Sequence, residues 1–244
     1  ANMFGLSGKN QQLCQKCRRS SCLYPKVCVN LDTNQLPSVK LWRRLRSIKR
    51  IKHIRVASGV RYDLILRDSS GQYLKDLCRH HVGGQLKIAP EHISDQVTRS
   101  MHKPGKDEYI KFIKEFKRIN KEIGKEQYII PYFISAHPGS RLGDTIQLAE
   151  FVRDNLQYYP EQVQNFTPTP MTVSTSMYYT GLDPDSGKEV HVPHTRERKW
   201  QRALLQYKNK ENWGPAREAL KASGRRDLIG FSPRCLVKPE KKQK

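Results

Sequence analysis

Residues 107–139, DEYIKFIKEFKRINKEIGKEQYIIPYFISAHPG, contain a helix pattern followed directly by a strand pattern, and this order decides the fold class. The first half places apolar side chains at the spacing of one helix face: Tyr109, Phe112, Ile113, Phe116, Ile119 and Ile123. Gly124 ends this helix, because glycine readily adopts the left-handed conformation found at helix ends. The apolar run that follows predicts a strand, and it ends in small and polar residues.

The same alternation of helix and strand extends to both sides, from residue 38 to about residue 180. Before the quoted stretch, the pattern predicts a helix, a short strand, a helix, a strand and a short helix, at residues 38–50, 53–59, 73–81, 85–90 and 94–103. Ser94 can cap the last of these helices. After the quoted stretch, the sequence predicts a helix at 143–157 and a strand that runs into a long loop at 163–181. Such alternation builds a parallel sheet, so we expect an α/β fold with about four parallel strands.

The alternation of helix and strand patterns stops after about residue 182. Residues 182–198 are polar and predict a loop or hairpin, and two amphipathic helices follow at 198–208 and 213–225. Trp200 and Trp213 fit core or docking positions on these helices. We therefore expect a barrel-like region at 38–182, a small helical domain at 183–236 and a basic tail at 237–244.

The chain is strongly basic. Its 45 Lys and Arg residues against 23 Asp and Glu residues give a formal net charge of +22. Such an excess attracts polyanions, and RNA in particular. A solvated basic surface explains the same composition, so the charge alone does not choose between a nucleic-acid partner and none.

Four cysteines lie close together near the start of the chain, and we expect residues 1–37 to be a metal-binding segment. Cys14, Cys17, Cys22 and Cys28 can converge on one Zn²⁺ or one iron–sulfur cluster, because a short loop can surround a single metal centre. The neighbouring arginines favour the thiolate form that binds metal. The spacing is not that of a standard zinc finger, and four ordinary thiols remain the alternative.

The sequence predicts a cytoplasmic protein. No signal peptide opens the chain, and no apolar run approaches the length of a membrane span. Disulfides are uncommon in the cytoplasm, so the cysteine run there indicates metal or redox chemistry.

The predicted strands end in polar, glycine or proline residues, which suggests a rim that holds a ligand. These ends carry Ser58 and Arg61 after the first strand, Glu91 and His92 after the second, and His137 after the third. Each residue also has a plain structural interpretation, such as a helix cap for Glu91 or a turn for His137. No phosphate-binding loop, nucleophile elbow or carboxylate pair for glycoside chemistry is evident. The rim therefore suits a polar cofactor.

Several long motifs closely resemble the YgiQ-type family of radical S-adenosylmethionine proteins. They include HHVGGQLKIAPEH, GKEQYIIPYFISAHPGS, VQNFTPTP and MYYTGLDP, and they occur in the order of the family. The opening ANMFGL, the cysteine run ending CVNLDTN, and IRVASGVRYDL and DLIGFSPRCLV look like the same family. The resemblance implies a partial (β/α)6 barrel of the radical type, with its last four strands in this chain, and then the small C-terminal domain of the family.

The resemblance also implies two cofactors, S-adenosylmethionine and a [4Fe–4S] cluster. In the family the cluster is held by a C-x3-C-x2-C loop after the first strand, and Cys14-x2-Cys17-x4-Cys22 does not fit that pattern. We therefore expect this chain to be the C-terminal part of such an enzyme, inactive without the N-terminal half of the barrel as its partner.

By the same resemblance, Glu91 contacts a cofactor hydroxyl, Ser58 and Arg61 face the carboxylate or the substrate, and His137 forms the floor of the pocket. The four-cysteine run then holds an auxiliary iron–sulfur cluster or a structural zinc. The alternative function is RNA binding by a basic module that a bound metal stabilises. A third alternative is a purely structural domain whose barrel no longer closes.

Overall fold

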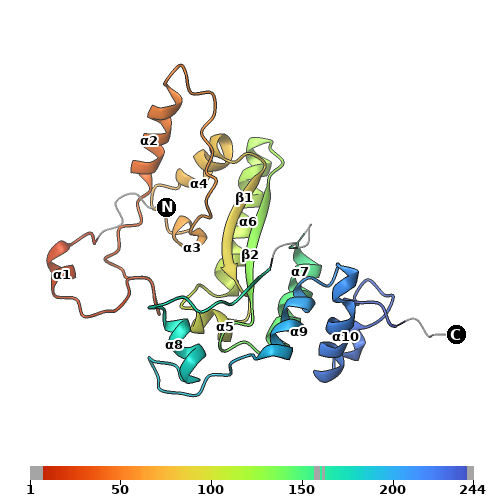
Figure 1. Cartoon of the computed structure of the whole chain (residues 1–244). Helices are drawn as coiled ribbons and strands as arrows, with labels where there is room; N and C mark the ends of the chain where they lie inside the picture. The colour runs from red at the N-terminus through yellow and green to blue at the C-terminus, as the bar shows by residue number, and fades with distance from the viewer. Residues whose placement is uncertain (1–7, 157–159, 161–162, 241–244) are drawn as a thin grey trace. The chain divides into compact units, whose positions relative to one another are not determined.

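A computed structural model of the chain describes residues 8–156, 160 and 163–240 (Figure 1). The chain forms two compact units. The first comprises Ala1–Ala89 and Lys106–Pro131, and the second comprises Pro90–Gly105 and Tyr132–Lys244. Each unit therefore combines segments that are distant in the sequence.

The first unit is built around the long helix α6 (Lys106–Ile123), which the sequence predicted. Its buried face carries Tyr109, Phe112, Phe116 and Ile119, and it contacts the short helices α3 (Tyr62–Ile65) and α4 (Tyr73–Asp76). Three further helices belong to this unit: α1 (Gln11–Gln15), α2 (Leu36–Arg46) and a π-helix at Leu77–His81 that continues α4. The helix expected at 73–81 is therefore present, and its second half is wound as a π-helix.

A three-stranded sheet of order β1-β2-β3 is present in the described residues. Its strands are β1 (Gln85–Glu91), β2 (Tyr128–Ser135) and β3 (Gln164–Asn165), and β3 lies parallel to β2, with Ser135 opposite Asn165. The boundary between the two units falls within β1 and β2.

The strand expected at 53–59 is not present in the described part of the structure. Only one parallel bridge, Val60 to Ile88, joins this region to β1, and the N–H of Val60 donates to the carbonyl of Lys87 at 3.0 Å. Residues 57–59 are small and exposed, so they offer little side-chain packing to hold a ladder. The mixed α/β class is confirmed, whereas closure into a partial (β/α)6 barrel stays a prediction.

The second unit contains the helices α5 (Asp95–Ser100), α7 (Leu142–Asn155), α8 (Val173–Thr180), α9 (Thr195–Leu205) and α10 (Trp213–Ala222). Short 3-10 turns lie at Lys210–Asn212 and Arg226–Leu228. Helix α9 packs on both α7 and α10, which agrees with the two C-terminal helices expected from the sequence. Trp213 donates to the carbonyl of Tyr207 at 2.8 Å, and Trp200 donates to Glu218 at 3.0 Å, so hydrogen bonds of both tryptophans join α10 to α9 and the segment after it.

Two local expectations are wrong in this unit. The long loop expected after β3 contains helix α8, which begins where the hydroxyl of Thr172 accepts from the N–H of Thr175 and ends at Gly181 with φ 68°. Ser94 stands before α5 but its side chain accepts no capping bond; its hydroxyl donates to Asp144. The expected end of the α7 helix, at 157, lies outside the described residues. None of the described helices is both long and apolar enough to cross a bilayer.

Candidate functional site

The candidate site lies in the second unit, where β1 and β2 end. β1 ends in Glu91, with φ 65°, and β2 is followed directly by Ala136, with φ 59°, so each strand leads into a left-handed residue other than glycine. Such residues are uncommon, and they gather at functional sites. Each turn is followed by a buried imidazole, that of His92 at 2% exposure and that of His137 at 3%.

His137 is held on both ring nitrogens. Its Nδ1 lies 2.6 Å from the carbonyl oxygen of Pro138, and its Nε2 lies 2.8 Å from the hydroxyl of Ser174. A carbonyl only accepts, so Nδ1 carries the proton and Nε2 accepts from Ser174. Burial lowers the pKa of His137 to about 4, against the opposing effect of the Pro138 hydrogen bond. The ring is therefore neutral and fixed in one tautomer, with Phe166 packed edge-on at 5.0 Å.

His92 is neutral with the opposite tautomer. Its Nδ1 accepts from the backbone N–H of Ser94 at 3.0 Å, so its proton is on Nε2. Burial lowers the pKa of His92 to about 4; Asp144 opposes this shift and His137 adds to it. Within the described part of the chain, Nε2 is buried and has no hydrogen-bond partner. An unpaired buried donor costs about 1–3 kcal/mol. It is a group that the acceptor atom of a polar ligand could satisfy.

The carboxylate of Asp144 connects the end of β1 to the start of α7. It accepts from the hydroxyl of Ser94 at 2.6 Å and from the backbone N–H of Arg141 at 2.9 Å. Asp144 therefore stabilises the first turn of α7 and fixes Ser94 beside His92. Neither role follows from the local sequence, which predicts Ser94 as a cap for its own helix.

Gln201 on α9 locks the turn after β2. Its side-chain oxygen accepts from the N–H of Ala136 at 2.9 Å and from the hydroxyl of Ser140 at 3.0 Å, and its amide donates to the carbonyl of Ser140 at 3.2 Å. Gln201 is fully buried. Gln201 is not among the site residues predicted from the sequence. Its signal was a glutamine beside the apolar stripe of an amphipathic helix.

Glu91, a predicted cofactor ligand, lies at the edge of this cluster. Its side chain is 15% exposed, and its carboxylate lies 3.3 Å from the amine of Lys103. Glu91 and His137 are thus placed in one unit, after neighbouring strands of one sheet.

The two other predicted ligands, Ser58 and Arg61, belong to the first unit. Ser58 is exposed. Arg61 forms a two-bond pair with the buried carboxylate of Asp63, with Nε at 2.9 Å and a terminal nitrogen at 2.7 Å. The hydrogen bond to Asp63 raises the pKa of Arg61, so the guanidinium stays charged.

The cysteine run begins in helix α1, which contains Cys14, and continues as a loop with hydrogen bonds between its own backbone groups. The N–H of Cys28 donates to the carbonyl of Cys22 at 2.8 Å, and the N–H of Cys17 donates to that of Cys14 at 3.1 Å. Cys14, Cys17 and Cys22 are exposed, and the sulfur of Cys17 accepts from the N–H of Arg19 at 3.5 Å. In the described parts of the chain, no three potential metal-ligating side chains are gathered around one point. A set of four thiols suits a thiolate-bound metal in its chemistry, and ligation by this run stays a prediction.

Comparison with known proteins identifies the relatives. The chain is 51% identical to a UPF0313 protein of Methanocella arvoryzae over 240 residues, which cover 98% of this chain and 40% of that protein. It is 46% identical to the UPF0313 protein YgiQ of Escherichia coli over 243 residues, or 97% of this chain and 32% of that protein. A domain of unknown function, DUF3362, matches residues 161–244. The homologues are therefore UPF0313 proteins of the YgiQ type, and this chain spans 40% or less of their length in these two cases.

Proposed function

We propose that this chain is the C-terminal portion of a radical S-adenosylmethionine enzyme, and that the turns after β1 and β2 form part of its cofactor pocket. Two facts support the proposal before any geometry is considered. The motifs quoted above follow the order of that family, and the relatives are longer proteins of the YgiQ type.

The observation that carries the proposal is the pair of left-handed turns at Glu91 and Ala136 with their buried neutral imidazoles. In parallel α/β folds, ligands bind where the strands end at their carboxyl ends. Neutral rings leave the site without added positive charge, which suits the adenosine part of the cofactor.

The chain's own residues would bind and orient this ligand. Glu91 can accept a hydrogen bond from a ribose hydroxyl, and the unpaired Nε2–H of His92 can donate to a ring nitrogen or an oxygen. His137 would form the floor, because Pro138 and Ser174 hold its ring in place. When bound, the [4Fe–4S] cluster of the complete protein would supply the electron for the radical reaction.

Ser58 and Arg61, which belong to the first unit, are proposed for a carboxylate or the substrate on the sequence resemblance alone. Asp63 engages two N–H groups of Arg61, and a guanidinium has five, so donors remain for a second carboxylate. Cys14, Cys17, Cys22 and Cys28 are proposed as the ligands of an auxiliary iron–sulfur cluster or a zinc ion.

Binding of labelled S-adenosylmethionine to the complete protein, prepared without oxygen, tests this proposal. We expect Glu91→Gln to weaken binding about tenfold, the size of one lost charge-assisted hydrogen bond. Glu189→Gln, which changes an exposed glutamate of the same unit, should leave the affinity unchanged. If both variants bind as the natural protein does, Glu91 is not a ligand. If the natural protein does not bind at all, the proposed pocket is wrong.

A further inference from the structure

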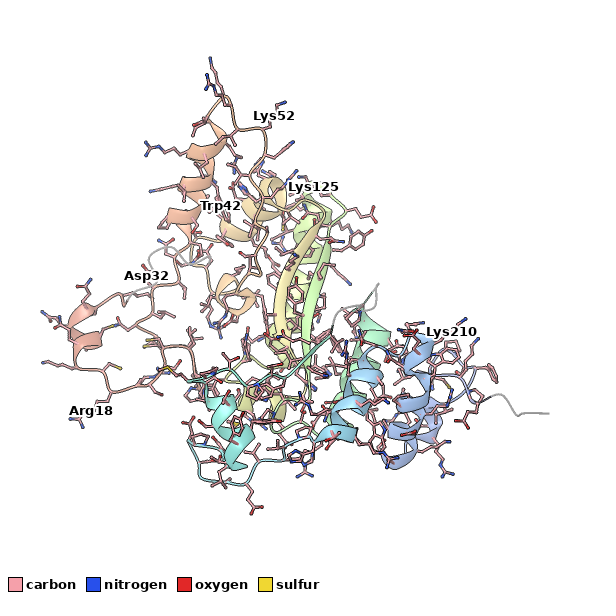
Figure 2. All side chains as sticks on the ribbon, viewed as in Figure 1. Arg18, Asp32, Trp42, Lys52, Lys125 and Lys210 are labelled. Carbon is pink, nitrogen blue, oxygen red and sulfur yellow. The ribbon has the colours of Figure 1, made fainter. Side chains whose placement is uncertain are left out.

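The first unit contains a cavity of about 370 Å³ that is lined almost entirely by basic side chains. Seven of its nine lining residues are basic: Arg46, Lys52, His53, Arg55, Arg79, His80 and Lys125. The other two are Ile51 and Ile54, so no lining residue is acidic. Lys52 and Lys125, which come from distant parts of the sequence, both line this cavity. Figure 2 labels both side chains.

The walls of the cavity are fixed by hydrogen bonds. Arg46 lies 3.0 Å from the buried carboxylate of Asp76 and donates to Nε2 of His81 at 2.6 Å. The Nδ1 of His81 in turn donates to the carbonyl of Ile54 at 3.0 Å. Trp42 packs on the His81 ring at 4.5 Å. The segment 51–55 is therefore anchored to the π-helix, and the donors on both are arranged before any ligand arrives.

The positive charges in the cavity are largely uncompensated. Asp76 forms ion pairs with Arg43 and Arg46, so its negative charge is balanced by these two arginines. Within the described ranges, no carboxylate forms an ion pair with Lys52, Arg55, Arg79 or Lys125. Burial, followed by the charge of Arg46, lowers the pKa of His80. A group that carries negative charge would be attracted here by Coulomb forces and by a ready set of N–H donors.

The basic surface continues beyond the cavity along the chain. Residues 33–62 contain nine Lys and Arg residues and no acidic residue. Lys49 and Arg50 lie next to the cavity segment, and both are exposed. A small phosphorylated ligand would need only the cavity, whereas a polymer with regularly spaced phosphates would use the extension as well.

We propose that this cavity and the adjoining basic segment bind the phosphate backbone of single-stranded nucleic acid. A flexible single strand can place a phosphate with its sugar into a concave site, which the convex surface of a duplex does not do. The residues that line the cavity precede the first residues of β1 and β2, whereas Glu91, His92 and His137 lie at or just after the ends of these strands. The inference therefore does not rest on radical chemistry.

Binding of a fluorescent single-stranded RNA of mixed sequence to the complete protein, measured over a range of salt concentrations, tests the inference. The test variant carries Lys52→Gln and Arg79→Gln together. Both side chains are exposed, and neither makes a hydrogen bond in the described structure. Two lost phosphate contacts should weaken binding about tenfold and reduce the slope of log affinity against log salt by about 1.4.

The matched control carries Lys111→Gln and Lys114→Gln together, which removes two exposed charges of α6 outside the cavity. It should keep the slope of log affinity against log salt that the natural protein has. A charge-preserving pair, Lys52→Arg with Arg79→Lys, should retain binding. The inference is overturned if the cavity pair and the control pair lose affinity equally, because the effect then follows net charge alone.

Parallel titrations identify the class of ligand. A single-stranded DNA of the same sequence distinguishes RNA preference from general backbone binding, and both outcomes keep the inference. Tighter binding of a duplex overturns it, as does binding of pyrophosphate or of anionic phospholipid vesicles without binding of either single strand.

Discussion

The Nε2 atom of His137 lies 2.8 Å from the hydroxyl of Ser174, so an imidazole that follows β2 is tied to the first turn of α8. This bond is the reason that His137 has a single orientation, because Pro138 alone would leave one ring nitrogen without a partner. Its loss should be measurable before any ligand is known.

Replacing Ser174 with alanine should lower the free energy of unfolding by about 1–3 kcal/mol, since the Nε2 lone pair would stay buried without a donor. Ser176→Ala is the matched control, because Ser176 is exposed on the same helix. Urea denaturation compares them. Equal stabilities for the two variants would show that the bond contributes nothing.

Stability should fall as the pH is lowered from about 6.5 to about 4. In the folded chain the pKa of both His92 and His137 is about 4, against an ordinary value of 6.5. Between these values the unfolded chain binds protons that the folded chain does not, so acid favours unfolding. Protonation linked to each ring should lower the free energy of unfolding by up to about 3 kcal/mol. Urea denaturation at several pH values measures the fall, which His137→Gln should make shallower. A flat profile would mean that these rings are not buried as described.

Gln201→Leu should be among the most destabilising single changes near the site. It leaves the N–H of Ala136 and the hydroxyl and carbonyl of Ser140 without this partner, at an expected cost of about 2–4 kcal/mol. The same substitution at Gln147, which is exposed on α7, should be close to neutral. A thermal melt of both variants decides the matter, and similar midpoints would refute the role assigned to Gln201.

Cys17→Ser should release the auxiliary metal if the four cysteines bind one ion or cluster. Quantification of iron, zinc and sulfide in the complete protein should show that this metal is lost while any other cluster is retained. Cys235→Ser, which alters a cysteine far from the run, should keep the full metal content. Full retention of metal in Cys17→Ser would contradict ligation by four cysteines.

The elements that could be predicted from the sequence are those with strong local periodicity. The apolar face of α6 and the stop at Gly124 were both correct, because helical spacing is a property of neighbouring residues. The local pattern predicts a loop where helix α8 forms, since its eight residues, VSTSMYYT, carry only a weak helical pattern. Strand β3 pairs with β2 over just two residues, which is too short for an alternation pattern to define its bounds.

Only part of the candidate site could be predicted from the sequence. General rules for parallel sheets point to the turns after the strands, where Glu91 and His137 lie, whereas Ser58 and Arg61, predicted for the same rim, belong to the other unit. The partners of these turns come from far along the chain: Ser174 is 37 residues from His137, and Gln201 is 65 residues from Ala136. Such contacts are set by tertiary packing, and no local pattern reports them.

The most direct test of the central claim is whether the complete protein, prepared without oxygen and then reduced, cleaves S-adenosylmethionine. We predict cleavage in the natural protein and a clear loss of it in Glu91→Gln at subsaturating cofactor, with the iron content unchanged. A protein with its full iron content that neither binds nor cleaves the cofactor would contradict the account.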